Sequence, residues 1–504
     1  MNAKPQSARQ CARRSISLPR CLVAAATART FTFAAAAALA LALAFPRAAP
    51  ALAQQQRAAP PNIVLFIADD LGATDISPYG NVVVHTPNLE QLAHESMVFS
   101  HAFAASPTCS PSRSAIYTGM LPFRNGAHAN HSMVRPETPS LVTRFQQLGY
   151  RVALGGKLHV GPASVFPFEI VASSNVPEPG FEGNGDLWTD LNMAAVDQWL
   201  GTVDATRPFL LIVADHSPHV AWPLVPEYDD AGVNIPPNHI DTREYRHSRA
   251  RYYTDVTKMD RNVGLLVASL RRHGLLDRTL LAFTADQGPQ LAFGKWGLYD
   301  LGIRTPLIVR WPGHVPPATR SDALVSLVDL PPTFVEAAGA PAPHDIDGRS
   351  FLAVLTGERH THRDTVYATH TGDGAMNRTP MRMVRTQHYK YILNLADTIY
   401  TTHIDRLRRQ DWGDDYWNSW VERSYFDPAA ASLLWRYHHR PTEELYDLES
   451  DPLELRNLVY QPEYAGILAG LRASMIAWRA AQGDSETGPE KLEGRPQGPP
   501  YIPR

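Results

Sequence analysis

Three short apolar runs, each followed at once by polar residues, restrict the fold of this chain more than any other feature. They are Asn62–Ala68, Phe209–Ala214 and Leu280–Ala285. Continuous apolar runs without alternation are typical of strands buried on both faces of a parallel sheet. Segments with helical spacing lie between them, at 86–96 and 252–273. The sequence therefore predicts an α/β domain with a doubly wound, mostly parallel sheet.

The residues that follow these runs predict a site rich in oxygen ligands, because ligands of doubly wound sheets bind beyond the carboxyl ends of the strands. An acid after a single strand is often only a helix cap, but three strands that end alike favour a site. Carboxylate and amide oxygens suit Ca²⁺, with Mg²⁺ as the alternative, whereas Zn²⁺ recruits more His and Cys. The residues at these three ends are Asp69, Asp70, His216, Asp286 and Gln287.

Residues 1–53 have the order of a signal peptide. Residues 1–30 are basic and contain no acid, an apolar run follows at 31–45, and Ala-Leu-Ala at 51–53 is a small-residue cleavage site. The apolar run is shorter than the roughly 20 residues of a membrane span, which makes an uncleaved anchor the less favoured alternative. We expect an exported protein, periplasmic or secreted, with no membrane segment after cleavage.

Removal of that segment makes the protein acidic. The chain has 47 Lys or Arg and 50 Asp or Glu, and the segment takes away seven basic residues and no acid, which leaves 40 against 50 and a net charge of −10. Nucleic-acid binding needs Lys and Arg to neutralise phosphates. We therefore expect no nucleic-acid partner, and an anionic substrate would need a local basic pocket.

Cys109 is the one cysteine that remains after residue 53, so an intrachain disulfide is not possible. It is either a small packing residue or a residue with a chemical role. Ser110-Pro111 reads as a helix start, which places Cys109 at the amino end, where free amides favour negative charge. Arg113, one turn further on, can reach back to it. We therefore expect a lowered thiol pKa, as in a nucleophile or a metal ligand.

Several sequence blocks in a fixed order resemble the sulfatase family. CSPSR followed by SAIYTG resembles the signature whose cysteine is oxidised to formylglycine. GKLHVGPASVFPFEI, PMRMVRTQHYKYILNL and PEKLEG are most similar to the heparan N-sulfatase (sulfamidase) subfamily, which usually has Asn in place of Gln287 and Arg in place of Lys295. The other blocks are NIVLFIADD, GYRVALGGKLHVGP, DHSPH, TADQG and EELYDLESDPLELRNL.

The resemblance implies an alkaline-phosphatase-like fold and one Ca²⁺ per chain. The implied ligands are Asp69, Asp70, Asp286 and Gln287, with modified Cys109 completing the shell. Formylglycine hydrate carries two hydroxyls on one carbon: one attacks sulfur, and the other expels sulfate by re-forming the aldehyde.

The remaining implied roles belong to basic residues. Arg113 anchors the hydrate, and Lys157 and Lys295 hold sulfate oxygens. His216, with a pKa near the ordinary value of about 6.5, protonates the leaving nitrogen. His159 removes the proton that releases sulfate, and we expect it beside Lys157 on one side of an extended segment. The role of His219 is left open between substrate contact and loop support.

The predicted domains are a catalytic domain at 60–375, a smaller α+β domain with an antiparallel sheet at 376–484, and a polar tail at 485–504. The aromatic and charged segment 405–426 either walls the pocket or forms an exposed interaction surface. The expected partners are a sulfated saccharide and a formylglycine-generating enzyme, and a homodimer is left open.

The expected reaction is hydrolysis of the N-sulfate of glucosamine at a non-reducing end of heparan or heparin. An O-sulfatase, a phosphonate or phosphate ester hydrolase, and an inactive glycan-binding module are the alternatives. The set of Cys109, Arg113, Lys157, His159 and His216 argues against the last.

Overall fold

The computed structural model describes residues 60–177, 189–204, 206–374, 377–396, 399–410 and 412–485. The predicted signal peptide lies outside these ranges, and so does the predicted tail beyond residue 485.

The three apolar runs form three neighbouring parallel strands at the centre of an eight-stranded sheet. β1 (Asn62–Ala68) lies between β8 (Phe209–Ala214) and β9 (Thr279–Ala285) and is parallel to both. β11 (Leu307–Arg310) is antiparallel to both of its neighbours, so the sheet is mixed but mostly parallel. The other members are β2 (Met97–Phe99), β4 (Arg151–Gly156), β5 (Glu169–Ile170) and β12 (Thr319–Ser321).

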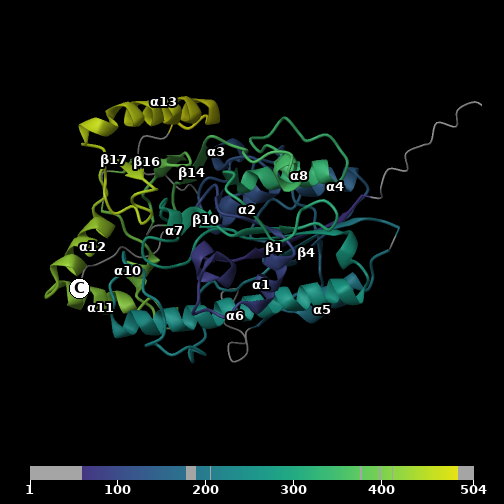
Figure 1. Ribbon diagram of the computed structural model, residues 1–504, viewed down its shortest axis with the longest axis horizontal. Helices are drawn as coiled ribbons and strands as arrows, with labels where there is room; N and C mark the ends of the chain where they lie inside the picture. The colour runs from purple at the N-terminus through teal and green to yellow at the C-terminus, as the bar shows by residue number, and fades with distance from the viewer. Residues whose placement is uncertain are drawn as a thin grey trace, which may run out of the picture. The chain divides into compact units, whose positions relative to one another are not determined.

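Alternate residues of β1 enter two separate cores, one on each face of the sheet. Leu65 belongs to the core under α2 (Cys109–Thr118), α4 (Leu141–Gln147) and α8 (Leu330–Ala337). Phe66 belongs to the core on the other face, and Figure 1 shows the helices of the two faces above and below the strands. The helices of that second face are α1 (Pro87–His94), α5 (Met193–Leu200) and α6 (Arg243–Arg272).

The sequence pattern located α1 within two residues of its ends but detected only part of α6. The helix begins at Arg243, nine residues before the predicted start, because the side chain of Thr242 accepts a hydrogen bond from the backbone N–H of Tyr245 and caps it. Most residues of its first half are buried, so this half lacks the polar face that makes helical spacing visible in a sequence.

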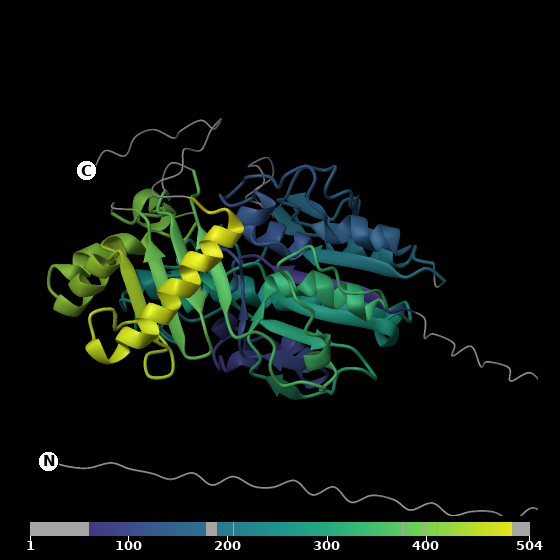
Figure 2. The ribbon, with the colours of Figure 1, turned by 90° about the horizontal axis from the view of Figure 1, so that it is seen from above.

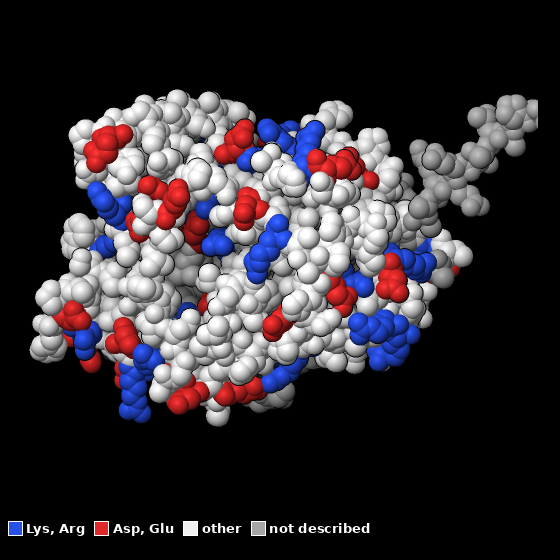
Figure 3. Space-filling model, viewed as in Figure 1, with Lys and Arg blue, Asp and Glu red and all other residues white. Residues whose placement is uncertain are grey.

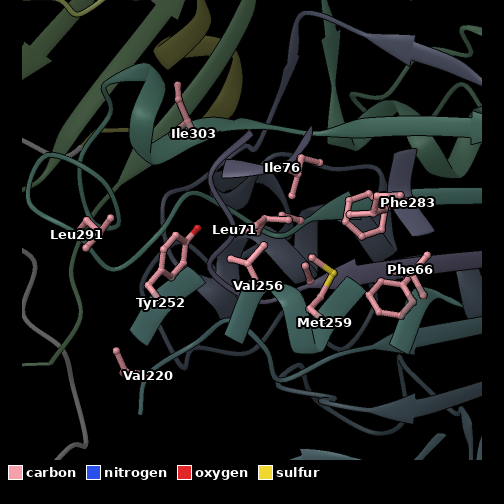
Figure 4. Packing of buried hydrophobic residues seen from close by; sticks show 14 of the residues in the cluster. Phe66, Leu71, Ile76, Val220, Tyr252, Val256, Met259, Phe283, Leu291 and Ile303 are labelled. Atoms are coloured by element: carbon pink, nitrogen blue, oxygen red, sulfur yellow. The ribbon is translucent and has the colours of Figure 1, made fainter. Parts of the chain in front are cut away.

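The core between α6 and the sheet is tightly packed. The rings of Phe66 and Phe283 stack with centroids 5.6 Å apart, and both side chains are buried. Figure 4 shows them in one cluster with Val256 and Met259 of α6. This packing holds β1 and β9 in register, and both strands lead directly into the predicted site.

Phe283→Ala is expected to lower the free energy of unfolding by about 3–5 kcal/mol, because it removes a fully buried ring and leaves a cavity. Phe426, which is 88% exposed, provides the control, and Phe426→Ala should change stability by less than about 0.5 kcal/mol. Denaturant unfolding of both variants checks the prediction, and equal effects would contradict it.

A second, antiparallel sheet lies beside the large one. β14 (Val366–His370), β15 (Met381–Arg385), β16 (Tyr389–Asn394) and β17 (Glu443–Asp447) pair in chain order. Figure 2 shows α13 (Ala465–Gln482) crossing these strands. The predicted antiparallel sheet is therefore confirmed. Both sheets belong to one compact unit, and β14 lies ahead of residue 376, so the division at 375 stays a prediction.

α2 is enclosed on two sides. Its Ile116 and Tyr117 belong to the core under the large sheet, whereas Ala115 packs into the cluster beneath α13. All ten residues of the helix, Cys109 included, are buried.

Segment 405–426 overlaps α10 (His403–Leu407) and contains α11 (Tyr416–Ser424). Tyr416 and Trp420 are buried against Tyr245 of α6, whereas Phe426 is exposed. The segment therefore contributes mainly to the core, and its Trp412 also lines the cavity described below.

The remaining elements are short, except for the eleven-residue α12. Among the described residues, no helix has both the length and the apolar character needed to cross a bilayer. On the face drawn in Figure 3, basic and acidic side chains are interspersed on a mostly uncharged surface. The elements not yet introduced are β3 (Ala102–Phe103), α3 (Pro122–Asn125), β6 (Asn175–Pro177), β7 (Thr189–Leu191), α7 (Asp300–Ile303), β10 (Arg304–Thr305), β13 (Val325–Ser326), α9 (Leu352–Leu355) and α12 (Pro428–His438).

Candidate active site

The predicted site residues converge because four strands end, and one helix begins, at the same edge of the sheet. Asp69 follows β1, Lys157 follows β4, His216 follows β8 and Asp286 follows β9, while Cys109 is the first residue of α2. They lie in or directly beneath a cavity of about 720 Å³. Predicted residues on the cavity wall are Asp69, Cys109, Lys157, His159, His216, His219 and Lys295.

Cys109 lies against the paired carboxylates. Its Sγ is 3.5 Å from Asp69 Oδ1 and 4.0 Å from Asp70 Oδ1. Ligand atoms of these three residues lie within 4.8 Å of one another, close enough to bind one metal ion. The Nε2 of Gln287 is 3.0 Å from the same sulfur and 2.5 Å from Asp70 Oδ1.

The donor set fits a hard divalent cation. Its carboxylates are fully buried, and the other amide atom of Gln287, Oε1, is buried without a hydrogen-bond partner among the described residues. A half-turn of the amide would present this oxygen to Asp70 and Cys109. Asp286 is engaged with other partners, since Arg113 donates to its Oδ2 at 2.8 Å and the backbone N–H of Asp70 donates to its Oδ1 at 3.1 Å.

Three basic side chains balance these acids. Arg113 Nη2 lies 3.3 Å from Asp69 Oδ1, Lys157 donates to Asp69 Oδ2, and Lys295 donates to Asp70 Oδ2 at 2.6 Å. The predicted basic cluster around Cys109 is thus present.

The two neighbouring carboxyls differ in their pKa. Burial opposes ionisation of Asp69, but Lys157 and Arg113 hold the pKa of that carboxyl well below its usual range. Burial raises the pKa of Asp70, and it raises the pKa of Asp286 to about 7.

The expectation of a lowered pKa for the Cys109 thiol is wrong. Burial raises that pKa, and the nearby acids add to the effect, which together outweigh the attraction of Lys157 and Lys295. The position at the amino end of α2 is as predicted, but a helix end buried beneath two carboxylates does not favour a thiolate. An unmodified Cys109 is therefore a poor nucleophile.

His216 also differs from its expected state. Its Nε2 lies 2.8 Å from Asn175 Oδ1, and burial, with Lys157 nearby, lowers its pKa to about 3. The ring is therefore neutral at pH 7. A proton-donating role would require an anion beside the ring, because negative charge raises the pKa of a histidine.

The segment from Lys157 to His159 is not extended, since His159 has a φ of +44°. Both side chains nevertheless line the cavity. His159 Nε2 lies 2.8 Å from His131 Nδ1, and burial strongly lowers the pKa of His159. A neutral imidazole of this kind can accept a proton.

His219 lies on the cavity wall with its Nε2 3.6 Å from Asp70 Oδ2. Its Nδ1 contacts the carbonyl of Val220 at 2.5 Å, so it contacts both the acidic cluster and its own loop.

Several wall residues were missed by sequence reasoning. His131 and Asp373 come from loops with no strand-end signal, and Asn175 is separated from β8 by more than thirty residues of sequence. The sequence blocks that resemble the sulfatase family were the other available signal, and none of them includes His131 or Asp373. The other missed wall residues include Asn130, Lys258, Gln290, Trp296 and His403. Trp412 was not missed, since it lies in segment 405–426, for which a pocket wall was one of the two predicted roles.

Comparison with known proteins agrees with this geometry. The family model "Sulfatase" matches residues 61–340. Human N-sulphoglucosamine sulphohydrolase is 31% identical over 478 residues, covering 84% of this chain and 90% of the human protein. The chain belongs to the sulfatase family. Members of this family hydrolyse sulfate esters, and in this chain Asp69, Asp70 and Cys109 form a group that could hold a metal ion.

Two further similarities refine the assignment. A family model described as "N-sulphoglucosamine sulphohydrolase, C-terminal" matches residues 288–411 of this sulfatase. An ulvan-active sulfatase of Formosa agariphila is 32% identical over 429 residues, covering 84% of this chain and 81% of that protein.

The fold is shared with solved sulfatase structures. The structure of BT4656 in complex with its substrate D-glucosamine-2-N,6-O-disulfate superposes with a TM-score of 0.63 at 21% identity, covering 85% of this chain and 99% of the other. The predicted alkaline-phosphatase-like fold is confirmed.

Proposed function

We propose that this sulfatase removes the N-sulfate of glucosamine at the non-reducing end of heparan or heparin. One observation carries the proposal: the segment 288–411, which matches the C-terminal model of N-sulphoglucosamine sulphohydrolase, supplies one side chain that reaches the acidic cluster, Lys295, and part of the cavity wall. Its contributions are Gln290, Lys295, Trp296, Asp373 and His403.

The arrangement of charged side chains in the site supports action at a chain end. The basic side chains that reach Cys109 surround a single point, with Lys157 Nζ 3.9 Å from the sulfur. This arrangement suits one sulfate in a pocket rather than a row of sulfates in a groove. The mature chain would also carry a net charge of −10, which disfavours binding a long polyanion along the surface.

The nucleophile proposed is formylglycine made from Cys109, whose hydrate supplies one hydroxyl to attack sulfur and a second to release sulfate. Asp69, Asp70, Asp286 and Gln287 would hold a Ca²⁺ ion that polarises this group and the sulfate oxygens. Lys157 and Lys295 neutralise the charge that develops on those oxygens.

Two histidines then move protons. As the S–N bond breaks, His216 donates a proton to the leaving nitrogen, which would otherwise depart as a strong base. The sulfate brings negative charge next to His216 and raises its pKa from the low value of the free site. His159, neutral in the free site, accepts the proton of the second hydroxyl.

His216→Ala is expected to lower kcat for N-sulfoglucosamine by about 10²–10³-fold, because the nitrogen leaving group needs a proton. It should lower kcat for 4-nitrophenyl sulfate by less than about tenfold, since nitrophenolate leaves without one. His344→Ala, at an exposed histidine outside the cavity wall, is the matched control. Equal losses on both substrates would rule out the acid role.

The substrate itself is tested by supplying N-sulfoglucosamine and glucosamine 6-O-sulfate in parallel and measuring released sulfate. The proposal expects faster release from the N-sulfate. The 32% identity with an ulvan-active sulfatase favours one second candidate, an O-sulfatase on another sulfated glycan. Clear preference for an O-sulfate would establish that candidate and reject the sulfamidase assignment.

Before it becomes active, the protein would be modified at Cys109 and exported. A formylglycine-generating enzyme would modify Cys109, and the segment 1–53 would direct export to the periplasm or beyond. N-terminal sequencing of the purified protein tests the cleavage after residue 53.

A further inference from the structure

Asp373, His131 and His159 form a line of polar side chains along the cavity wall. His159 Nε2 is 2.8 Å from His131 Nδ1, and His131 Nε2 is 3.5 Å from Asp373 Oδ1. The other oxygen of Asp373 accepts a hydrogen bond from Trp296 Nε1 at 2.8 Å. The reaction described above has no role for His131 or Asp373.

The loop that carries His131 is held in place by two hydrogen bonds of the preceding residue, Asn130. The side-chain oxygen of Asn130 accepts a hydrogen bond from the backbone N–H of Ser110 at 3.1 Å, at the start of the helix that bears Cys109. The backbone N–H of Asn130 donates to the carbonyl of Gly372 at 2.9 Å, next to Asp373. The position of His131 is therefore tied both to the nucleophile and to Asp373.

Both histidines have a backbone conformation that a side chain disfavours. The φ of His131 is +63° and that of His159 is +44°. Such residues persist where surrounding contacts hold them, and each costs on the order of 1 kcal/mol or more. His131 and His159 both have this conformation, and their rings are joined by a hydrogen bond. We take this as a sign that the fold holds the two rings together.

The chemistry of the three groups determines where the protons lie. A carboxylate can only accept hydrogen bonds. Burial opposes ionisation of Asp373, but its contact with His131 and the charge of His403 hold the pKa of its carboxyl far below the usual range. The tautomer of His131 that satisfies both neighbours therefore carries its proton on Nε2, toward Asp373, and accepts at Nδ1.

His159 must then donate from Nε2, which leaves its Nδ1 without a proton. This Nδ1 is buried and has no hydrogen-bond partner among the described residues. It is thus the one ring atom of His159 that is left to accept a proton from a reacting group.

We propose that Asp373 and His131 are positioning residues that hold His159 in its Nε2–H tautomer and so keep Nδ1 available as the base. Nδ1 takes the proton of a hydroxyl on the former Cys109 side chain as the bond from that carbon to the sulfate oxygen breaks and the aldehyde forms. The identity of that proton rests on the proposed function, whereas the tautomer does not.

The tautomer can be measured without any turnover. Protein labelled with ¹⁵N-histidine gives long-range ¹H–¹⁵N correlations that distinguish a protonated from an unprotonated ring nitrogen, and His159→Gln and His131→Gln assign the signals. We expect His159 to be protonated at Nε2 in the wild type. In Asp373→Asn the amide can donate to His131 Nε2, so His131 should donate from Nδ1 and His159 should switch to the Nδ1–H tautomer.

Kinetics give the second measurement, on whichever sulfate ester or sulfamate the enzyme hydrolyses. Asp373→Asn should lower kcat by roughly 10- to 100-fold with KM within about twofold. Asp373→Glu, which keeps a carboxylate, should retain the wild-type tautomer and most of the rate. Thr189→Ala changes the same cavity wall at a residue outside this line, and it should leave the tautomer of His159 unchanged.

An unchanged tautomer in Asp373→Asn would overturn the proposal, and so would a rise in KM with kcat preserved, which would make Asp373 a substrate contact. If Asp373→Asn does not fold, the Asp373→Glu and His131→Gln spectra decide the same question. A tautomer switch in an enzyme that prefers an O-sulfate would uphold the positioning role and reject only the proposed substrate.

Discussion

Cys109→Ser is expected to abolish repeated turnover, with a loss of at least about 10³-fold in kcat. A serine has one hydroxyl and can be sulfated, but it cannot form the aldehyde that expels the sulfate. The unmodified thiol is no better, because burial and the nearby Asp69 and Asp70 raise its pKa. The measurement is the rate of sulfate release together with the intact mass of the variant.

Two results complete this test. Peptide mass spectrometry of active wild-type protein should show an aldehyde at residue 109 that reacts with hydrazides, and the Ser variant should gain the mass of one sulfate after exposure to substrate. Ser112→Ala in the same helix alters a nearby hydroxyl and leaves Cys109 in place, so it should retain the aldehyde. Full activity from protein that contains only unmodified cysteine would refute the mechanism.

Removal of divalent cations is expected to lower activity by at least about 100-fold and to lower the melting temperature as well. The three carboxylates of Asp69, Asp70 and Asp286 are fully buried, and a bound cation offsets their mutual repulsion. Ca²⁺ should restore both properties, and Mg²⁺ should restore them less well. Activity assays and thermal unfolding after chelation measure the effect, and elemental analysis identifies the ion.

Gln287 allows a variant that changes the metal site without removing a charge. Gln287→Leu deletes the oxygen donor and should lower the affinity for Ca²⁺ by roughly 10- to 100-fold. Gln287→Asn keeps an amide oxygen and is the matched control. Stoichiometric zinc in the active protein, or full activity after complete chelation, would contradict the calcium site.

The arrangement of the large sheet could be predicted because its central strands are buried on both faces. β1, β8 and β9 read as unbroken apolar runs, and each leads directly into site residues. Helical spacing, the signal that would have marked the first half of α6, was missing from the sequence. This half is buried, in part against aromatic residues of α11, and so lacks a polar face. Which segment covers a helix is a tertiary fact that helical spacing does not contain.

The residues of the site could be predicted from the sequence, but their pKa values could not. Sequence blocks brought Asp69, Cys109 and Lys157 together correctly. The pKa of Cys109 depends on how deeply α2 is buried, and no motif records that depth. His131 and Asp373 are separated by more than 240 residues of sequence and meet only because the loop after β14 lies against Asn130.

The burial of α2 restricts when Cys109 can be oxidised. Every residue from Cys109 to Thr118 is enclosed between the large sheet and the cluster beneath α13, and Cys109 is 2% exposed. A modifying enzyme could grip this segment only while the chain is still unfolded. Maturation would then compete with folding, and a molecule that folds first would remain inactive until it unfolds again. Expression conditions that slow folding should therefore raise the fraction of active protein without changing the sequence.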